Sequence, residues 1–165
     1  MRVNYTTYDV RRGQDSLNAR NLPDVMTLAH QENSPHPFDY ARIIGIFHVD
    51  IIHNVPGASL VPVSVELLWV RRFRVDDSFS AGFKKKRLHR VEFVDAGDPE
   101  AFGFLHPDEV IRAAHLIPAF HYQGTVEFLH GESLARSPGE TDDYRYFYIN
   151  MSVVSFCSSI CKCAH

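Results

Sequence analysis

Two stretches decide the fold of this chain: residues 40–52, Tyr-Ala-Arg-Ile-Ile-Gly-Ile-Phe-His-Val-Asp-Ile-Ile, and residues 61–74, Val-Pro-Val-Ser-Val-Glu-Leu-Leu-Trp-Val-Arg-Arg-Phe-Arg. The first is rich in β-branched and aromatic residues, which favour strands. In the second, apolar and polar residues alternate, as in a sheet with one face in water. A Pro56-Gly57 turn signal lies between them. The pattern therefore predicts two long strands joined in a hairpin.

Shorter segments extend this β pattern on both sides of the hairpin. Strand-like composition recurs at residues 3–10, 24–28, 88–94 and 144–150, whereas residues 11–15 are polar. One short helix is expected over residues 107–114, because Pro, Asp and Glu open that segment and alanines follow. With no alternation of strands and helices, the sequence predicts a mainly β protein folded as a small, partly open antiparallel barrel.

Composition predicts one domain and a soluble, intracellular protein. The chain has 165 residues and is 45% hydrophobic, which suits a single β-rich domain over residues 1–150. No stretch approaches the roughly 18 apolar residues of a membrane span, and the first residues do not form a signal peptide, so no membrane partner is expected. Because no cysteine precedes Cys157, disulfides cannot stabilise the body of the domain.

Residues 151–165 form a divergent tail with candidate metal ligands. Cys157, Cys161, Cys163 and His165 are residue types that bind zinc, but their spacing lacks a second ligand pair of the usual kind. A disordered tail is the favoured interpretation, and neither metal nor cofactor is predicted. The chain also lacks a nucleophile elbow, a phosphate-binding glycine loop and a zinc-protease helix. We therefore expect a protein that is not an enzyme and has no small-molecule substrate.

Positive charge is concentrated between residues 71 and 90. This segment contains eight basic residues and two aspartates, which gives it a net charge of +6 in a chain whose total is −3. The predicted nucleic-acid-binding residues are Arg71, Arg72, Arg74, Lys84, Lys85, Lys86, Arg87 and Arg90. Such a cluster can hold phosphates, with interleaved Trp69, Phe73, Phe79 and Phe83 as a stacking surface. The alternative is a solvated hairpin tip whose charges protect a sheet edge.

Two further interpretations concern the same region and the aromatic residues. Residues 84–87, Lys-Lys-Lys-Arg, also fit a nuclear import signal and favour the nucleus. A cage for methylated lysine is the other possibility, although residues of this kind more often belong to a core. The aromatic residues considered for it are Tyr40, Trp69, Tyr144, Tyr146 and Tyr148.

Long ordered blocks of the sequence carry a family resemblance. These blocks are residues 4–15, 40–49, 66–73, 98–104, 107–112, 115–120 and 146–150. Together they resemble the C-terminal region of fungal Plavaka-type transposases, which are cut-and-paste elements related to the CACTA and Kyakuja–Dileera–Zisupton groups. The resemblance covers residues 3–150 and ends where the divergent tail begins.

The resemblance implies an accessory role. The RNase H-like domain that cuts DNA in such transposases lies upstream of this region, so its acidic metal ligands have no counterpart here. The strand pattern of the family's C-terminal region is similar to SH3-like and BAH-like folds of chromatin proteins. The expected function is a non-catalytic accessory domain that contacts DNA, chromatin or other transposase domains. The alternative is an SH3-like or BAH-like module that binds proteins or histone tails.

Overall fold

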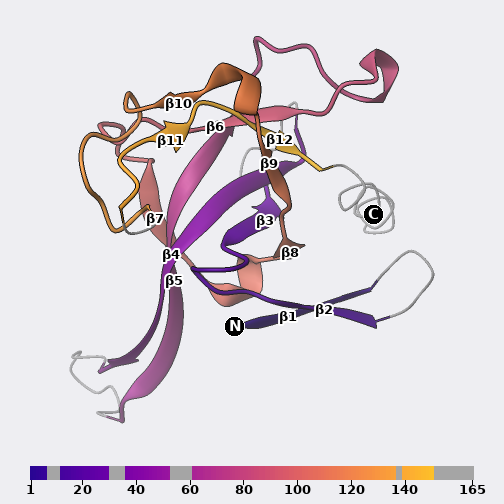
Figure 1. Ribbon diagram of the computed structural model, residues 1–165. Coiled ribbons are helices and arrows are strands. Elements are labelled where there is room, and N and C mark those ends of the chain that lie inside the picture. The colour runs from indigo at the N-terminus through magenta and orange to yellow at the C-terminus, as the bar shows by residue number, and fades with distance from the viewer. Residues whose placement is uncertain (7–11, 30–35, 53–60, 137–138, 151–165) are drawn as a thin grey trace.

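The described residues form a mainly β structure of antiparallel strands, as the sequence predicts. The computed structural model describes residues 1–6, 12–29, 36–52, 61–136 and 139–150 (Figure 1). Its elements are β1 (Arg2–Thr6), β2 (Arg12–Ser16), β3 (Asp24–Leu28), β4 (Phe38–Ile51), β5 (Val63–Val75), η1 (Phe83–Lys85), β6 (Arg90–Phe93), β7 (Phe102–Leu105), η2 (Pro107–Glu109), β8 (Arg112–Ala113), β9 (Leu116–Pro118), η3 (Phe120–Tyr122), β10 (Gly124–Thr125), β11 (Asp143–Tyr144) and β12 (Phe147–Ile149).

One eight-stranded sheet organises the described residues. Its strand order is β8-β3-β4-β5-β6-β12-β9, and β7 also pairs with β5. The predicted hairpin of two long strands is confirmed as β4 and β5, and β6, within the strand predicted at residues 88–94, is the next antiparallel neighbour of β5. The sheet is not closed into a barrel, so what is confirmed of the predicted barrel is its mainly β, antiparallel character. Two small sheets, β1-β2 and β10-β11, complete the fold.

Each face of the large sheet covers its own hydrophobic core. On the first face, the central pair Tyr40 and Phe73 packs with side chains of β3, β6 and β12. On the second face, the pair Ile43 and Val70 packs with residues of β3, β7 and β8. Side chains alternate across a strand, so one sheet supplies both cores. The two cores lie at one end of the β4–β5 hairpin, and the other end projects from the body (Figure 1).

A β-bulge in β4 changes which residues of this strand lie on each face of the sheet. Ile43 pairs with Val70 and Gly45 with Trp69, which leaves Ile44 as an extra residue. A shift of one residue exchanges the two faces of a strand. Before the bulge the even-numbered residues of β4, such as Tyr40, lie on the first face, and after it the odd-numbered residues do. The bulge therefore decides which side chains of the projecting end lie together.

One expectation about local structure is wrong. The helix predicted over residues 107–114 is a single 3-10 turn, η2 (Pro107–Glu109), followed by β8. The backbone N–H groups of Ile111 and Ala114 donate to carbonyl groups of β3 at 2.9 and 2.8 Å, so pairing with the sheet replaces helical hydrogen bonds. In addition, the polar residues 12–15 lie in β2, which pairs with β1 although their composition is not strand-like.

Some predictions fall outside the described residues. The tail from residue 151 onward, with Cys157, Cys161, Cys163 and His165, is one of them, as is the Pro56-Gly57 turn. Within the described ranges, no helix has the length and apolar character needed to cross a membrane.

Candidate nucleic-acid interface

Four consecutive cations lie on a compact turn at the end of the loop between β5 and β6. We call Lys84, Lys85, Lys86 and Arg87 the basic turn; all four are exposed. The N–H of Gly82 donates to the Arg87 carbonyl at 2.8 Å, and the N–H of Lys85 donates to the Gly82 carbonyl at 3.0 Å. Gly82 and Lys86 have φ angles of 103° and 52°, which let the chain reverse direction within these few residues. The turn thus holds the four charges close together.

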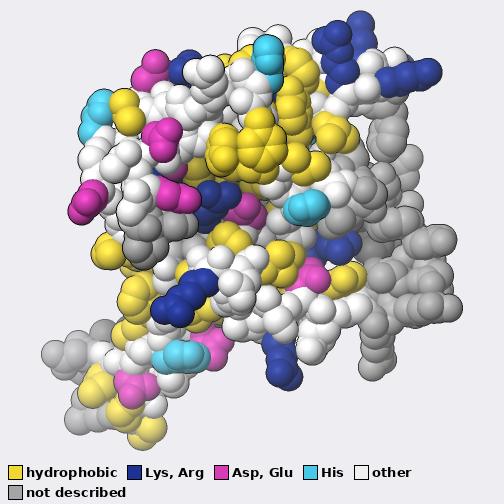
Figure 2. Space-filling model, viewed as in Figure 1, with side chains coloured by type: hydrophobic (Ala, Val, Ile, Leu, Met, Phe, Trp, Pro, Cys, Tyr) yellow, Lys and Arg dark blue, Asp and Glu magenta, His cyan; other side chains and the backbone are white. Residues whose placement is uncertain are grey.

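The positive charges of the basic turn are not neutralised by neighbours. No ion pair joins any of its four side chains to another residue in the described parts of the chain. In Figure 2 its cationic side chains project together at the upper right, with no acidic side chain beside them on that face. Unpaired cations that share one protrusion produce a local positive potential, which attracts polyanions.

Arg71 lies inside the protein. Its side chain is fully buried on the first face of the sheet, where its two terminal nitrogens donate to the carboxylate of Asp143 at 3.0 Å. Arg136 donates to the same carboxylate at 2.8 Å, and the Arg71 guanidinium lies 3.7 Å from the centre of the Phe93 ring. Burial lowers the pKa of Arg71, while the charge of Asp143 opposes that change. Arg71 therefore belongs to a buried ionic cluster and has no surface to offer a ligand.

Arg90 is also internal and is enclosed by aromatic rings. Its guanidinium lies 3.8 Å from the ring centre of Tyr146, 4.3 Å from that of Phe79 and 5.1 Å from that of Tyr122. Asp76 accepts from its Nε at 2.9 Å. Burial would raise the pKa of Asp76, but hydrogen bonds from Ser78 and Arg90 lower it below its usual value. An aromatic box does exist in this protein, and its own arginine occupies it.

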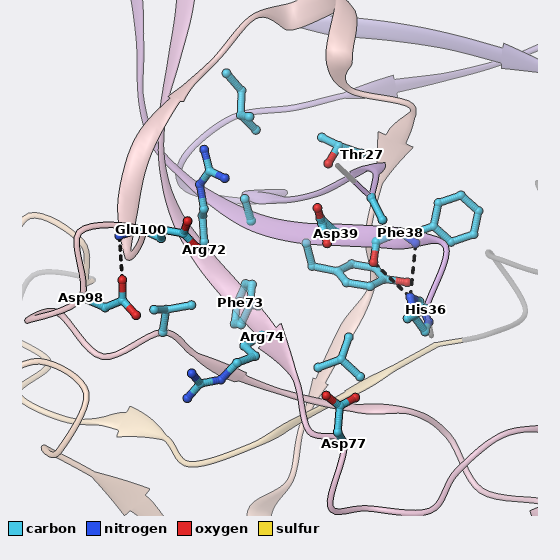
Figure 3. A pocket seen from close by; sticks show the side chains of 16 residues that line it. Thr27, His36, Phe38, Asp39, Arg72, Phe73, Arg74, Asp77, Asp98 and Glu100 are labelled. Carbon is cyan, nitrogen blue, oxygen red and sulfur yellow. Dashed lines mark hydrogen bonds between the residues drawn. The ribbon is translucent and has the colours of Figure 1, made fainter. Parts of the chain in front are cut away.

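Arg72 and Arg74 line a groove on the second face, away from the basic turn. The groove has a volume of about 510 Å3 and also contains the carboxylates of Asp39, Asp98 and Glu100. Figure 3 shows the guanidinium groups of Arg72 and Arg74 pointing away from each other. Arg74 pairs with Glu92 at 3.4 Å, whereas the buried Nε of Arg72 has no hydrogen-bond partner within the described structure. The eight predicted residues thus occupy several separate environments, and only the basic turn presents free cations together.

The predicted aromatic surfaces are not assembled. Phe73 is buried in the core of the first face, Phe79 covers Arg90, and Trp69 lies at the base of the projecting hairpin. Trp69 is half-buried. Tyr40 is buried, and Tyr146 belongs to the box around Arg90, so the proposed lysine cage lacks an open centre at these residues. The side chain of Phe83 lies outside the described structure.

Metal-binding geometry is not found in the described ranges. No three His, Cys, Asp or Glu side chains in them lie close enough to hold an ion. The cysteine-rich tail is outside those ranges, and its zinc-binding capacity stays untested.

One feature of the sequence separates Arg71 from its basic neighbours. Along β5, Arg71 shares the odd-numbered positions with apolar residues, whereas the even-numbered positions of Arg72 and Arg74 hold both polar and apolar residues. The alternation alone does not show that Arg71 is buried, because Val63 on the same row is exposed. The partner of Arg71, Asp143, is 72 residues away, so no local pattern reveals the pair. For Arg90 the alternation is misleading, because aromatic residues from two other segments cover the polar side of β6.

Comparisons with known proteins identify no similar protein. No protein-family model, curated protein or solved structure matches this chain. Its relation to Plavaka-type transposases therefore stays a prediction from the sequence blocks.

Proposed function

We propose that this protein is a non-catalytic accessory domain that contacts nucleic acid through the basic turn. One observation carries the proposal: four adjacent exposed cations that form no ion pair with any acidic residue of the described ranges, in a chain whose net charge is −3. Such a local excess attracts phosphates even when the protein as a whole is acidic.

The contact we propose is with the phosphate backbone. Base recognition needs side chains that read base edges or rings on which bases stack. Around the basic turn, Phe79 is engaged with Arg90, so it is not a free stacking platform. Binding should therefore be independent of sequence and should weaken steeply as the salt concentration rises.

Fluorescence anisotropy with a labelled DNA duplex tests this proposal. If all four cations neutralise phosphates, a plot of log K against log salt should have a slope of about −3 to −4. The variant K84Q/K85Q/K86Q/R87Q should lose most of the binding measured at low salt. Undiminished binding by this variant would exclude the basic turn as the contact site.

A second variant separates local charge from net charge. Replacing the exposed Arg2 and Arg20 by Glu also lowers the net charge by four, but at sites outside the basic turn. R2E/R20E should keep a salt slope close to that of the original protein. A similar loss in both variants would indicate only a general response to net charge.

The groove on the second face supports a second candidate, an SH3-like or BAH-like module that binds protein or histone tails. Its acidic residues Asp39, Asp77, Asp98 and Glu100 outnumber Arg72 and Arg74. Such a lining favours an extended peptide with lysine or arginine side chains. Titration with a lysine-rich peptide, followed by calorimetry, should detect binding that D98N/E100Q weakens. An unaffected affinity in that variant would remove the groove from consideration.

The proposal extends to the origin and the cellular location of the protein. We propose a transposase-derived origin from the sequence resemblance and a nuclear location from the exposed Lys-Lys-Lys-Arg run at residues 84–87. An RNase H-like reading frame directly upstream of the gene would support the origin. A reporter protein carrying the domain should enter the nucleus, and its Gln variant at residues 84–87 should stay outside.

A further inference from the structure

A strip of apolar side chains follows one face of the projecting hairpin. We define the arm as residues 46–52 and 61–67, the far ends of the β4–β5 hairpin with the residue that follows β4. Directly opposed residues share a face of a sheet, and three such pairs on the arm are entirely apolar. We call the apolar strip these pairs together with the two aromatic residues at the arm's base: Phe47 with Leu67, Val49 with Val65, Ile51 with Val63, and Trp69 with Phe104 of β7.

The bulge at Ile44 and the small size of Gly45 shape the base of the strip. A Cβ on Gly45 would lie 3.0 Å from the Phe47 ring, so this ring leans over the glycine beside Trp69. The apolar face of the arm is therefore continuous with the aromatic residues at its base. Figure 2 shows hydrophobic side chains along the arm at the lower left.

Five of the eight side chains of the strip are exposed, and Val65, Leu67 and Trp69 are half-buried. Val63 is 62% exposed, Phe104 60% and Phe47 44%. Together the eight side chains leave on the order of 500 Å2 of apolar surface in water, a size at which patches on monomers are often functional. In the described structure no third strand pairs with the arm. A strand added at either edge would leave the apolar face uncovered, so the occupant must lie across that face.

The dimensions of the strip fit a helix. From Val63 to Trp69 the strand rises about 20 Å, which equals the length of about 14 helical residues. Two neighbouring strands present a face roughly 10 Å wide, close to the diameter of one helix. A second copy of this chain fits less well, because the strip falls short of the roughly 800 Å2 per partner that a stable dimer buries.

Charge specifies the character of the helix. Between Arg42 and Arg71 the sequence has no Lys or Arg, and its acidic residues there are Asp50 and Glu66 on the other face of the arm. Asp108 and Glu109 follow β7 shortly after Phe104. Cations beside an apolar stripe would complement these carboxylates, whereas two copies of the arm would bring like charges together.

We infer that the apolar strip binds a basic amphipathic helix of a partner protein. The helix places its apolar stripe over the strip, and its lysines or arginines lie at the edges of the arm, from which they reach toward Asp50 and Glu66 on the other face. This inference is independent of nucleic-acid binding, because the basic turn and the arm are different parts of the molecule (Figure 1).

Trp69 supplies the assay, since it is the chain's single tryptophan and belongs to the strip. The probe is a synthetic helical peptide of about 16 residues with leucines at i, i+3, i+4 and i+7 and lysines beside them. It should produce a saturable blue shift of Trp69 emission. A peptide with glutamates in place of the lysines should bind at least tenfold more weakly; equal binding of the two peptides, or no response to either, would overturn the inference.

Variants on the two faces of the arm locate the binding surface. V49S/V65S should weaken peptide binding about tenfold or more through loss of apolar contact area, with an unchanged far-ultraviolet CD spectrum. F104S, on β7 and therefore outside the arm, should also weaken peptide binding. A loss in both variants cannot be explained by a folding defect of the arm alone. The matched control S64A changes the other face and should bind normally.

Analytical ultracentrifugation tests whether a second copy of this chain, and not a helix of a partner protein, covers the apolar strip. The free protein should be a monomer at the concentrations used for titration. A dimer that V49S/V65S dissociates would show that a second copy covers the strip and would overturn the inference of a helical partner.

Discussion

At the residue scale, Asp143 stabilises the buried positive charges of two arginines. Its carboxylate neutralises Arg71 and Arg136, and a cation in the interior is costly unless such a partner and its hydrogen bonds are present. Arg42, which pairs directly across the strands with Arg71, has its own carboxylate in Asp24 at 2.7 Å. Burial alone would lower the pKa of Arg42, but Asp24 raises it. On the first face, Arg42 and Arg71 therefore lie side by side with different carboxylate partners, Asp24 and Asp143, and Arg136 shares Asp143 with Arg71.

Replacing Asp143 by Asn should destabilise the protein strongly. The substitution keeps the shape of the side chain but leaves two buried guanidinium groups without a counter-charge, for a loss of about 3–5 kcal/mol in the free energy of unfolding. Urea unfolding followed by CD measures this loss. The control is Glu92→Gln at the more exposed pair with Arg74, which should cost less than about 1 kcal/mol. Equal losses would mean that burial does not set the strength of these pairs.

His36 should make stability depend on pH. Burial lowers the pKa of His36 below 6.5, and the neighbouring His89, 4.9 Å away between ring centres, lowers it further. The folded protein therefore resists a proton that the unfolded chain accepts near pH 6.5, so stability is lost as the pH falls through this value and down to the folded-state pKa. Each unit by which the pKa is lowered is worth about 1.4 kcal/mol.

The His36→Asn variant isolates this contribution. The free energy of unfolding should fall less for the variant than for the original protein between pH 7.5 and 5, as measured by urea unfolding at each pH. Parallel curves for the two proteins would show that His36 does not cause the pH dependence.

At the scale of elements, the β4–β5 hairpin combines two different roles. Its proximal half contributes Ile43, Val70 and Phe73 to the two cores, while its distal half contributes no residue to the buried part of either. β-Branched and aromatic residues occur in both halves of the hairpin, so the division follows from what packs against each half.

Shortening the arm should therefore leave the fold intact. Replacing residues 48–66 by Asn-Gly joins Phe47 to Leu67 through a two-residue hairpin turn. We expect the free energy of unfolding to change by less than about 1 kcal/mol, because large losses come from buried groups. Val70→Ala, at a fully buried position, should cost about 2 kcal/mol in the same assay. A comparable loss from the shortened arm would place the arm in the cooperative unit.

At the scale of the whole molecule, the two exposed features lie at different ends. The basic turn projects at one side of the sheet and the arm at another (Figure 1). A partner protein on the apolar strip would therefore leave the basic turn accessible. Salt should weaken binding of the DNA duplex steeply, whereas the mainly apolar contact on the arm should respond less.

Much of the architecture follows from local pattern. The alternation of Val63, Val65, Leu67 and Trp69 was enough to predict β5 and the face its apolar residues share. Asp24–Leu28 was likewise predicted as a strand. The η2 turn begins at Pro107 as expected, but its continuation was decided by β3, whose carbonyl groups accept hydrogen bonds from the following residues. Local preference is weak compared with a partner strand.

The sequence by itself determined that this protein is a mainly β, antiparallel chain with four consecutive cations, because side-chain period and charge are local properties. Only the tertiary structure decided that Arg71 and Arg90 are internal while Lys84–Lys86 and Arg87 remain in water, since Asp143 and the rings around Arg90 come from distant segments. The tertiary structure also decided that the apolar face of the distal hairpin stays exposed. An alternating strand signals only that one face is apolar, and burial depends on whether another element lies over that face.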